Sequence, residues 1–522
     1  MIRIAEKFVV LVLIYLFTNN IIAQTPSLVQ DINPGMGHSS LKNLTVKGTD
    51  LFFQANDGTH GFELWKYDGT TAILVQDIKP GTGSSTYESE KLTPHGTDLY
   101  FPADNGVNGY ELWKYDGTSA IMVQDIDPGI DGSYPLDLTV FGADLYFSAY
   151  DGTTGRELWK YDGASATLVE DICPGSNSSN PAFFTAFGSE LYFSAYDPAN
   201  GFELWKYDGI AATLVQDINP GAVGSNPSNL IVFGTDLYFV ANEGVNGFEL
   251  WKYDGTSASL VLDINSGSGS SSPNHLRVSG TNLYFTADDG TNGNELWMYN
   301  GTSNTLIDIN PGAGDSDPHE LIFLGTKLYF LAEDGTTGIP EIWKYNGTTA
   351  AKIDFVLGAV GVDPYGLGTI GSNLYFAAYD ATHGYELWKY DGVIATLVQD
   401  IYPGTGESEP FNFIAVGSDL FFTASDGING YELWKLTDLT VGSAKLNSYE
   451  KVQLYPNPVN SILTIDTKED IKSFEIIDLT GKKVESFSIQ NNTIDVSQLA
   501  DGVYFLQLQT EKGSVVKKFI KE

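Results

Sequence analysis

The sequence predicts an all-β protein: a β-propeller of nine four-stranded repeats closed by the N-terminal strand, then a small C-terminal Ig-like β-sandwich. Three observations predict this fold class. The phrase Glu-Leu-Trp-Lys-Tyr-Asp-Gly occurs nine times, complete or nearly so, and contains every Trp of the 522-residue chain. Each repeat holds four short apolar runs separated by turn residues. No run shows the 3.6-residue apolar period of a helix. The repeated tryptophans are Trp65, Trp113, Trp159, Trp205, Trp251, Trp297, Trp343, Trp388 and Trp434.

One repeat shows why each run is a strand. Between residues 228 and 264 the apolar runs cover residues 230–233, 237–240, 249–253 and 259–264. Their β-branched and aromatic residues favour strands. Asp254-Gly255, between the third and fourth runs, is a dipeptide typical of tight hairpins. Four antiparallel strands in a repeat of about 46 residues have the size of one propeller blade.

The two ends of the repeat region predict ring closure. Residues 28–32 form a fourth strand without a preceding repeat, and residues 432–435 form a third strand that lacks its fourth. Pairing of these segments would complete the last blade and remove two sheet edges. Nine blades exceed the usual four to eight, so an open superhelical stack or two smaller rings are the alternatives.

The chain ends predict export. Arg3 and Lys7 flank an apolar run at residues 8–17, and Ala23 precedes a plausible cleavage point, which is typical of a signal peptide. We therefore expect a signal peptide at 1–23, a propeller at 24–440, a linker at 441–451 and a further domain at 452–522. After cleavage no remaining segment is apolar and long enough to span a membrane.

Two groups of motifs resemble known families. The repeated phrase resembles the ELWxxDGT repeat of exported bacterial proteins, a resemblance that implies no established activity. Leu454-Tyr455-Pro456-Asn457-Pro458 and Asp478-Leu479-Thr480-Gly481-Lys482 are similar to motifs of the type A C-terminal sorting domain of the type IX secretion system in Bacteroidota. This resemblance implies the type IX machinery as a partner through residues 452–522. It also implies a secreted or outer-membrane surface location in a Gram-negative bacterium.

The charge of the chain limits the classes of partner that it can bind. The chain has a formal net charge of −38, and an acidic surface repels phosphate backbones, which disfavours nucleic acid. Cations, basic proteins and neutral glycans remain open, and the glycan or protein ligand is not identified. Cys173 is the only cysteine, so no disulfide can form within the chain.

No residue set predicts a catalytic site. One Glu recurs at the same place in all nine repeats, whereas a catalytic carboxylate is needed once in a distinct environment. We expect these Glu to be hydrogen-bonded or paired structural groups. A Lys follows eight of the nine Trp, Met298 being the exception, and this Lys could be the counter-ion. The nine Glu are Glu63, Glu111, Glu157, Glu203, Glu249, Glu295, Glu341, Glu386 and Glu432. The six His have no metal-ligand spacing.

The loop before each Glu-Leu-Trp has two interpretations. Asp-Gly loops can bind Ca²⁺ through carboxylate and carbonyl oxygens. They are also ordinary hairpin loops, in which Asp bonds its own backbone and Gly supplies a positive φ. The turn interpretation is favoured, and Ca²⁺ stays possible. The candidate Ca²⁺ ligands are Asp57, Asp151, Asp289, Asp334 and Asp426.

Strand directions place these loops and the long connections between blades on one side of the ring, which we call the long-loop face. Its loops vary in residue type, and variable loops on a rigid support are typical of recognition surfaces. We predict an exported binding or adhesion propeller with its ligand site on this face. A secreted polysaccharide-acting enzyme and a structural surface-layer component are the alternatives. The candidate ligand-binding residues are Glu88, Glu90, Asp315, Asp317, Glu407 and Glu409.

Overall fold

The structure is a computed structural model, and it divides the chain into two compact units, Met1–Asp438 and Leu439–Glu522. The described residues of the first unit are 25–86, 91–353, 355 and 363–437. Those of the second are 453–467, 471–478, 483–484, 489–490, 492–500, 502–510 and 513–521. The expected signal peptide (1–23) and linker (441–451) lie outside the described residues.

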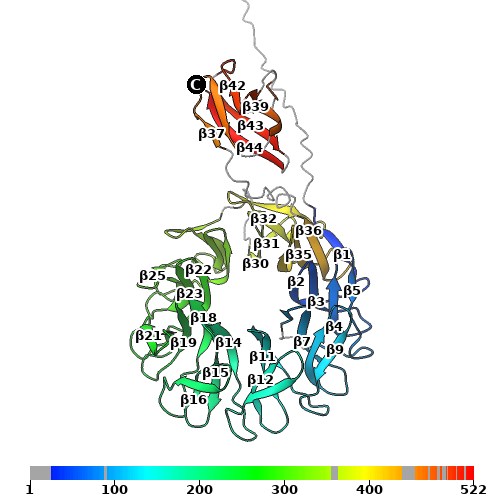
Figure 1. The fold of residues 1–522 in the computed structure, drawn as a ribbon, viewed down its shortest axis with the longest axis vertical. Helices are drawn as coiled ribbons and strands as arrows, with labels where there is room; N and C mark the ends of the chain where they lie inside the picture. The colour runs from blue at the N-terminus through cyan, green and yellow to red at the C-terminus, as the bar shows by residue number, and fades with distance from the viewer. Residues whose placement is uncertain are drawn as a thin grey trace, which may run out of the picture. The chain divides into compact units, whose positions relative to one another are not determined.

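Nine four-stranded antiparallel sheets follow one another around a ring in the first unit (Figure 1). The first strands are β2 (Lys42–Lys47), β6 (Thr93–His95), β10 (Leu136–Phe141), β14 (Ala182–Phe187), β18 (Ser228–Phe233), β22 (Asn274–Ser279), β26 (His319–Leu324), β30 (Tyr365–Ile370) and β34 (Phe411–Val416). The second strands are β3 (Asp50–Asn56), β7 (Asp98–Asp104), β11 (Asp144–Tyr150), β15 (Glu190–Asp197), β19 (Asp236–Ala241), β23 (Asn282–Asp288), β27 (Lys327–Ala332), β31 (Asn373–Asp380) and β35 (Asp419–Ala424).

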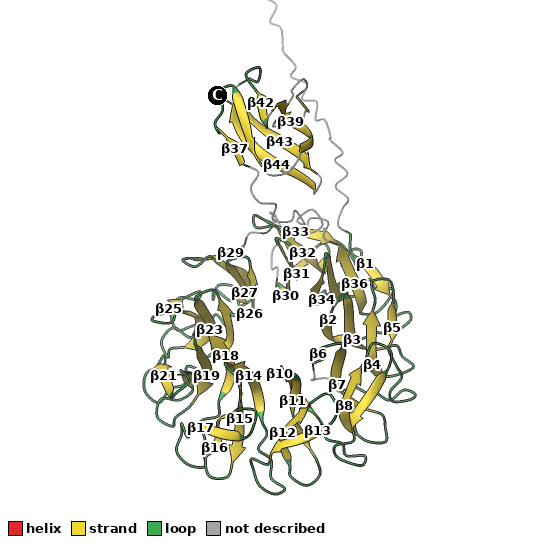
Figure 2. Cartoon of the chain, viewed as in Figure 1, coloured by secondary structure: helices red, strands yellow, loops and turns green. Residues whose placement is uncertain are grey.

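The third strands carry the repeated phrase: β4 (Phe62–Tyr67), β8 (Tyr110–Tyr115), β12 (Arg156–Tyr161), β16 (Gly201–Tyr207), β20 (Glu249–Tyr253), β24 (Asn294–Tyr299), β28 (Glu341–Tyr345), β32 (Gly384–Tyr390) and β36 (Glu432–Thr437). The fourth strands are β5 (Ala72–Leu74), β9 (Ala120–Gln124), β13 (Ala166–Glu170), β17 (Ala212–Gln216), β21 (Ala258–Leu262), β25 (Asn304–Ile307), β29 (Ala350–Lys352), β33 (Ala395–Gln399) and, in the last blade, β1 (Ser27–Gln30). The first strands lie at the inner side of the ring (Figure 2), and we call them the inner wall.

The N-terminal strand closes the ring. β1 pairs antiparallel with β36, with Leu28 opposite Trp434 and Gln30 opposite Leu433. This pairing completes the sheet β1-β36-β35-β34. The predicted closure by the first strand is therefore confirmed, and the open-stack and two-ring alternatives are wrong.

Neighbouring blades pack through aromatic pairs. The Tyr that ends a third strand contacts an aromatic ring on the second strand of the preceding blade, as in Tyr146 with Tyr207 and Phe421 with Tyr67. The second of these pairs joins the last blade to the first. Ring centroids in eight such pairs lie 5.2–6.2 Å apart, a range in which each pair contributes about 0.5–1.5 kcal/mol beyond burial.

The repeated tryptophans belong to this packing. Seven of the nine are at least 93% buried, and only Trp205 and Trp343 are intermediate. Trp65, for example, shares a core cluster with Phe421 and Leu433 of the neighbouring blade. The buried tryptophans thus contribute to packing between blades.

The repeated Glu connects each blade to the next. Glu249 is fully buried and accepts hydrogen bonds from the backbone N–H groups of Ile264 (3.0 Å) and Ser271 (2.8 Å), and from the Ser271 hydroxyl (2.5 Å). The Ser271 carbonyl in turn accepts from the N–H of Asp288 in the following blade (3.0 Å). The equivalent buried Ser is Ser39, Ser85, Ser133, Ser179, Ser225, Ser316 or Ser408 in the other described connections of this kind. The predicted structural role of the Glu is confirmed.

The Lys that follows the repeated Trp is not the counter-ion of this Glu. Lys66 pairs with Asp50 (2.7 Å) and Lys252 with Asp236 (2.7 Å), both at the start of the second strand. The expectation was wrong because Glu and Lys stand three residues apart, and an odd spacing puts side chains on opposite faces of a strand. Hydrogen bonds hold the eight buried Glu, and none of these eight forms an ion pair with a Lys or Arg among the described residues.

Glu341 in the seventh blade is the exception to the repeated arrangement. It is partly exposed and pairs with Lys352 (2.6 Å). The connection after it, at residues 354 and 356–362, lies outside the described residues, and its sequence has no Ser at the equivalent position.

The second unit contains two four-stranded sheets around its own core. One sheet has the order β37-β38-β42-β41, and the other β40-β39-β43-β44. Val459, Leu463, Leu506 and Phe519 are fully buried in the core. The Ig-like topology stays a prediction. The strands are β37 (Gln453–Tyr455), β38 (Ile462–Asp466), β39 (Ile471–Asp478), β40 (Lys483–Val484), β41 (Ile489–Gln490), β42 (Thr493–Asp495), β43 (Gly502–Thr510) and β44 (Gly513–Lys521).

The Glu network predicts a pH dependence of propeller stability. Burial raises the pKa of five of these carboxyls to about 7, against the hydrogen bonds that lower it; they are Glu63, Glu157, Glu295, Glu386 and Glu432. A raised pKa in the folded state means tighter proton binding than in the unfolded chain. The resulting stability is present below the ordinary pKa of Glu and is lost as pH rises through about 7. Hydrogen bonds to Asp57 and Asp380 raise the pKa of His60 and His383. These two histidines therefore also make the folded state less stable as pH rises.

We therefore expect the midpoint of thermal unfolding of the propeller to fall steadily between pH 5 and pH 8. Circular dichroism at constant ionic strength measures it. A midpoint that rises over this interval would contradict the raised pKa of the buried carboxyls.

Candidate functional site

The long-loop face is built where the loop before each Glu-Leu-Trp meets the connection to the next blade. The N–H of Phe62 donates to the Ser84 hydroxyl (3.1 Å), and the N–H of Ser85 donates to the Phe62 carbonyl (3.0 Å). Gly61 sits at this meeting with φ +69°, and a Cβ there would lie 2.5 Å from the Gly83 carbonyl oxygen. The predicted placement of loops and connections on one face is thus confirmed.

The predicted ligand-binding residues separate into different places. Glu88 and Glu90 lie outside the described residues. Asp315 accepts from the Asn294 N–H (2.7 Å) and Asp317 from the Asn294 amide (2.9 Å), in the connection between the sixth and seventh blades. Glu407 and Glu409 lie in the connection between the eighth and ninth blades. These residues therefore do not form a single site.

Glu409 belongs to a group of side chains that we call the tyrosine–carboxylate cluster: Asp363, Tyr365, Tyr385, Glu409 and Tyr431. The Tyr385 hydroxyl donates to Asp363 (2.6 Å), and the Tyr431 hydroxyl donates to Glu409. The rings of Tyr365 and Tyr385 are 5.6 Å apart. All five side chains are partly exposed, so the cluster presents both aromatic surface and carboxylates to solvent.

The cluster is strongly negative. Burial and a nearby carboxylate raise the pKa of each tyrosine: Glu409 acts on Tyr365 and Tyr431, and Asp363 acts on Tyr385. Glu407, which is exposed, adds to this effect on all three. Among the described residues, no Lys or Arg forms an ion pair with these carboxylates. The arrangement can attract a cation and offer it aromatic faces.

The sequence carries a signal for this cluster that is not a recognised motif. Tyr385 and Tyr431 precede Glu in the repeated phrase, and Asp363 and Glu409 stand at a left-handed position before the first strand of their blades, with φ of 29° and 43°. Both positions change from repeat to repeat inside an otherwise constant frame. The residue before the Glu is Phe62, Tyr110, Arg156, Phe202, Phe248, Asn294, Pro340, Tyr385 or Tyr431.

The candidate Ca²⁺ ligands accept hydrogen bonds from their own loops. Asp289 Oδ1 accepts from the N–H groups of Thr291 (2.9 Å) and Asn292 (2.7 Å), and Asp57, Asp151 and Asp426 make the same turn. Asp334 Oδ1 accepts from Thr336, and its Oδ2 from Lys352. In the part of the chain that the structure describes, no three His, Cys, Asp or Glu residues are placed to hold one metal ion. Ca²⁺ binding stays a prediction.

Comparison with known families supports the two-part organisation. Residues 453–522 match the family described as Secretion system C-terminal sorting domain, which confirms the predicted sorting domain. The protein is therefore a secreted or outer-membrane surface protein of Bacteroidota.

Residues 103–303 match the family described as Outer membrane protein assembly factor BamB. That match covers less than half of the chain and supports the propeller fold. No curated protein matches the chain.

Solved structures resemble the chain only distantly. A puromycin-hydrolyzing peptidase of Mycobacterium tuberculosis is 12% identical over 68% of this chain and 61% of its own, with a TM-score of 0.38. The β-propeller domain of the Trilobed protease from Pyrococcus furiosus is 11% identical over 58% of this chain and 95% of its own, with a TM-score of 0.32. The Niastella koreensis GH74 enzyme is 11% identical over 95% of this chain and 93% of its own, with a TM-score of 0.33. This chain thus spans about three fifths of the peptidase.

None of the residues described by the structure belongs to a helix that is long and apolar enough to cross a membrane.

The Asp loops provide a test of the turn interpretation. In the second repeat Asn105 stands at the Asp position and accepts from Val107 and Asn108 (both 2.9 Å), so a neutral amide can make the same turn. We expect Asp289→Asn to keep the free energy of unfolding within about 0.5 kcal/mol, and Asp289→Ala to lower it by about 1–2 kcal/mol. Urea unfolding measures both.

Each variant is also measured with and without Ca²⁺. A Ca²⁺-dependent stabilisation of the parent protein that Asp289→Asn removes would contradict the turn interpretation and place the ion in this loop.

Proposed function

We propose that the protein is a binding propeller, displayed on the cell surface or released, that holds a basic partner on the tyrosine–carboxylate cluster. The observation that carries the proposal is the gathering of Asp363, Glu407 and Glu409 beside three tyrosines, with no basic side chain paired to them among the described residues. The partner class follows from chemistry: Lys and Arg are attracted by carboxylates and pack on aromatic faces.

The rest of the chain supports a role outside the cell. We further propose that residues 1–23 are a signal peptide, that the sorting domain is of type A, and that the nine repeats belong to the ELWxxDGT class. The long-loop face is the binding face in this proposal because its framework is rigid while its residues vary. A ring held by buried hydrogen bonds would keep the tyrosines and carboxylates in place before a partner arrives, which lowers the ordering cost of binding.

The proposal is tested by titrating the exported chain with a hexalysine peptide. We expect the double variant Asp363→Asn and Glu409→Gln to weaken binding by roughly tenfold, because it removes two charges from the cluster and keeps hydrogen-bond acceptors for the tyrosines. The matched control is Asp315→Asn with Asp317→Asn, which removes the same charge from the same face two blades away. We expect little change in the control.

Equal losses of affinity in the two double variants would mean unspecific attraction to an acidic surface and would contradict the proposed site. Thermal unfolding of each variant checks that the ring is intact. A parallel incubation with polysaccharides tests the alternative class: saturable release of sugar would establish an enzyme.

A further inference from the structure

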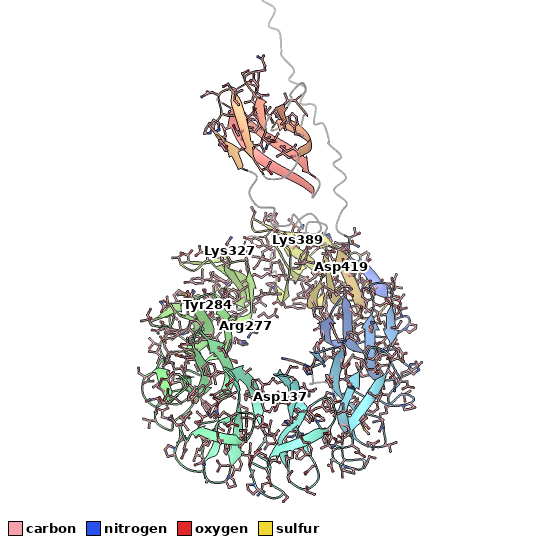
Figure 3. The ribbon with its side chains drawn as sticks, in the orientation of Figure 1. Asp137, Arg277, Tyr284, Lys327, Lys389 and Asp419 are labelled. Carbon is pink, nitrogen blue, oxygen red and sulfur yellow. The ribbon has the colours of Figure 1, made fainter. Side chains whose placement is uncertain are left out.

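A pocket of about 410 Å³ opens on the inner wall between the fifth and sixth blades. It is lined by residues of β18 and β22, including Asn229, Asn274, His275 and Arg277. Figure 3 shows Arg277 at the inner rim of the ring. The volume is within the range of small-molecule sites. None of these residues belongs to the tyrosine–carboxylate cluster, and the inference below does not depend on the proposed function.

The inner wall differs in charge from the rest of the propeller. Its nine strands contain three basic residues, Lys42, Lys47 and Arg277, and two acidic residues, Asp137 and Glu320. Residues 24–445 as a whole contain 17 basic and 54 acidic residues. An anion that is repelled by most of this protein therefore meets a wall that is close to neutral, with Arg277 in the pocket.

Blade six departs from the repeat at two positions of the pocket, His275 and Arg277. The place of Arg277 is taken by Thr or Ile in most blades, as in Thr45, Thr139 and Ile231. The place of His275 is left-handed in eight of the nine blades, with φ of 54° at His275, but its residue varies. The bulge is thus part of the frame, while the His and Arg side chains are particular to this blade.

Asn274 and Arg277 provide hydrogen-bond donors in the pocket. Asn274 Oδ1 accepts from the His275 N–H (2.8 Å) and the Asn229 amide (3.5 Å), which leaves the Asn274 NH₂ as the group available to a ligand. Arg277 donates one bond, from Nη1 to the Leu276 carbonyl (3.0 Å), out of the five N–H groups of a guanidinium. A set of donors around one cation matches an oxyanion with several acceptor lone pairs.

The carboxylates of Glu320 and Asp317 accept hydrogen bonds from residues other than Arg277. Glu320 accepts from the N–H groups of Gly366 (3.2 Å) and Leu367 (2.6 Å) in the next blade. Asp317 accepts from the Asn294 amide. No acidic side chain among the described residues lies within ion-pair distance of Arg277. The guanidinium therefore has no internal counter-charge within the described part of the chain.

We propose that this pocket binds an organic anion of monosaccharide size through a carboxylate or phosphate group, with Arg277 as the charged contact. The planar guanidinium fork fits two oxygens of either group. Asn274 and His275 supply further donors, and Leu230 and Ile231 supply an apolar wall for the body of the ligand.

Isothermal titration of the exported chain with three matched probes tests this site. Glucuronate carries a carboxylate, glucose 6-phosphate carries a phosphate, and glucose carries neither. At constant ionic strength we expect at least one anion to bind and glucose not to bind, and the two anionic probes separate the carboxylate and phosphate sources. We expect Arg277→Gln to weaken binding of the anion by roughly tenfold or more.

Lys327→Gln is the control, because it removes one exposed positive charge of the seventh blade outside the pocket. It should leave binding unchanged. Arg277→Lys keeps the charge without the guanidinium fork and should give an intermediate loss of affinity for the anion. This variant keeps the test available if Arg277→Gln folds poorly. The proposal is overturned if neither anion binds more tightly than glucose, if both Arg277 variants bind as the parent does, or if Lys327→Gln loses as much.

Discussion

The structure depends on one buried interaction, the acceptance of hydrogen bonds by the repeated Glu. A carboxylate taken out of water is costly unless its oxygens are satisfied. In the propeller they are satisfied by backbone N–H groups and a Ser hydroxyl of the connection that leads to the following blade. The cost of burial thus fixes the path of that connection, and the Ser carbonyl then holds the second strand of the next blade. Ring closure repeats the same bonds, since Glu432 accepts from Ile32 and Ser39 across the joined ends.

This framework separates constant from variable positions. The third strands, the aromatic pairs between blades and the Glu–Ser bonds are nearly the same around the ring. Chemical variety is left to two places: the residues beside the connections on the long-loop face, and the bulged positions on the inner wall. Tyr385, Glu409, His275 and Arg277 all occupy such positions. A ring assembled in this way can change its surface chemistry blade by blade without altering the bonds that hold the blades together.

Much of the fold could be predicted from local patterns. Strand order, hairpins and closure by residues 28–32 follow from short apolar runs, turn dipeptides and a strand left over at each end. The structural role of the repeated Glu, which eight of the nine share, follows from their recurrence. Their partners could not be read in the same way: the Lys three residues away faces the opposite side of the strand, and the Ser lies 22 residues later in a connection without regular structure.

The sites were harder to predict because they join residues from separate blades. Glu407 and Glu409 were selected for charge in variable loops, but Tyr365, Tyr385 and Asp363 become their neighbours only when blades eight and nine pack together. Asp315 and Asp317 satisfied the same sequence criterion and contact Asn294 instead. Arg277 was missed because a single basic residue in a strand carries no motif. Arg277 is distinguished only when the charged residues of the nine inner-wall strands are compared.

Hydrogen exchange at the connection after the fifth blade tests the central claim most directly. The Glu249→Gln variant replaces one carboxylate oxygen by an amide NH₂, which cannot accept a hydrogen bond. An acceptor is therefore lost either by the N–H of Ile264, which donates to Oε2, or by the N–H groups of Asn265 and Ser271, which donate to Oε1. We expect exchange at the amides that lose their acceptor to become faster by roughly tenfold or more, with no such change in Glu243→Gln, a partly exposed position of the same blade. Unchanged protection of all three amides in Glu249→Gln would contradict the claim that the repeated Glu holds this connection.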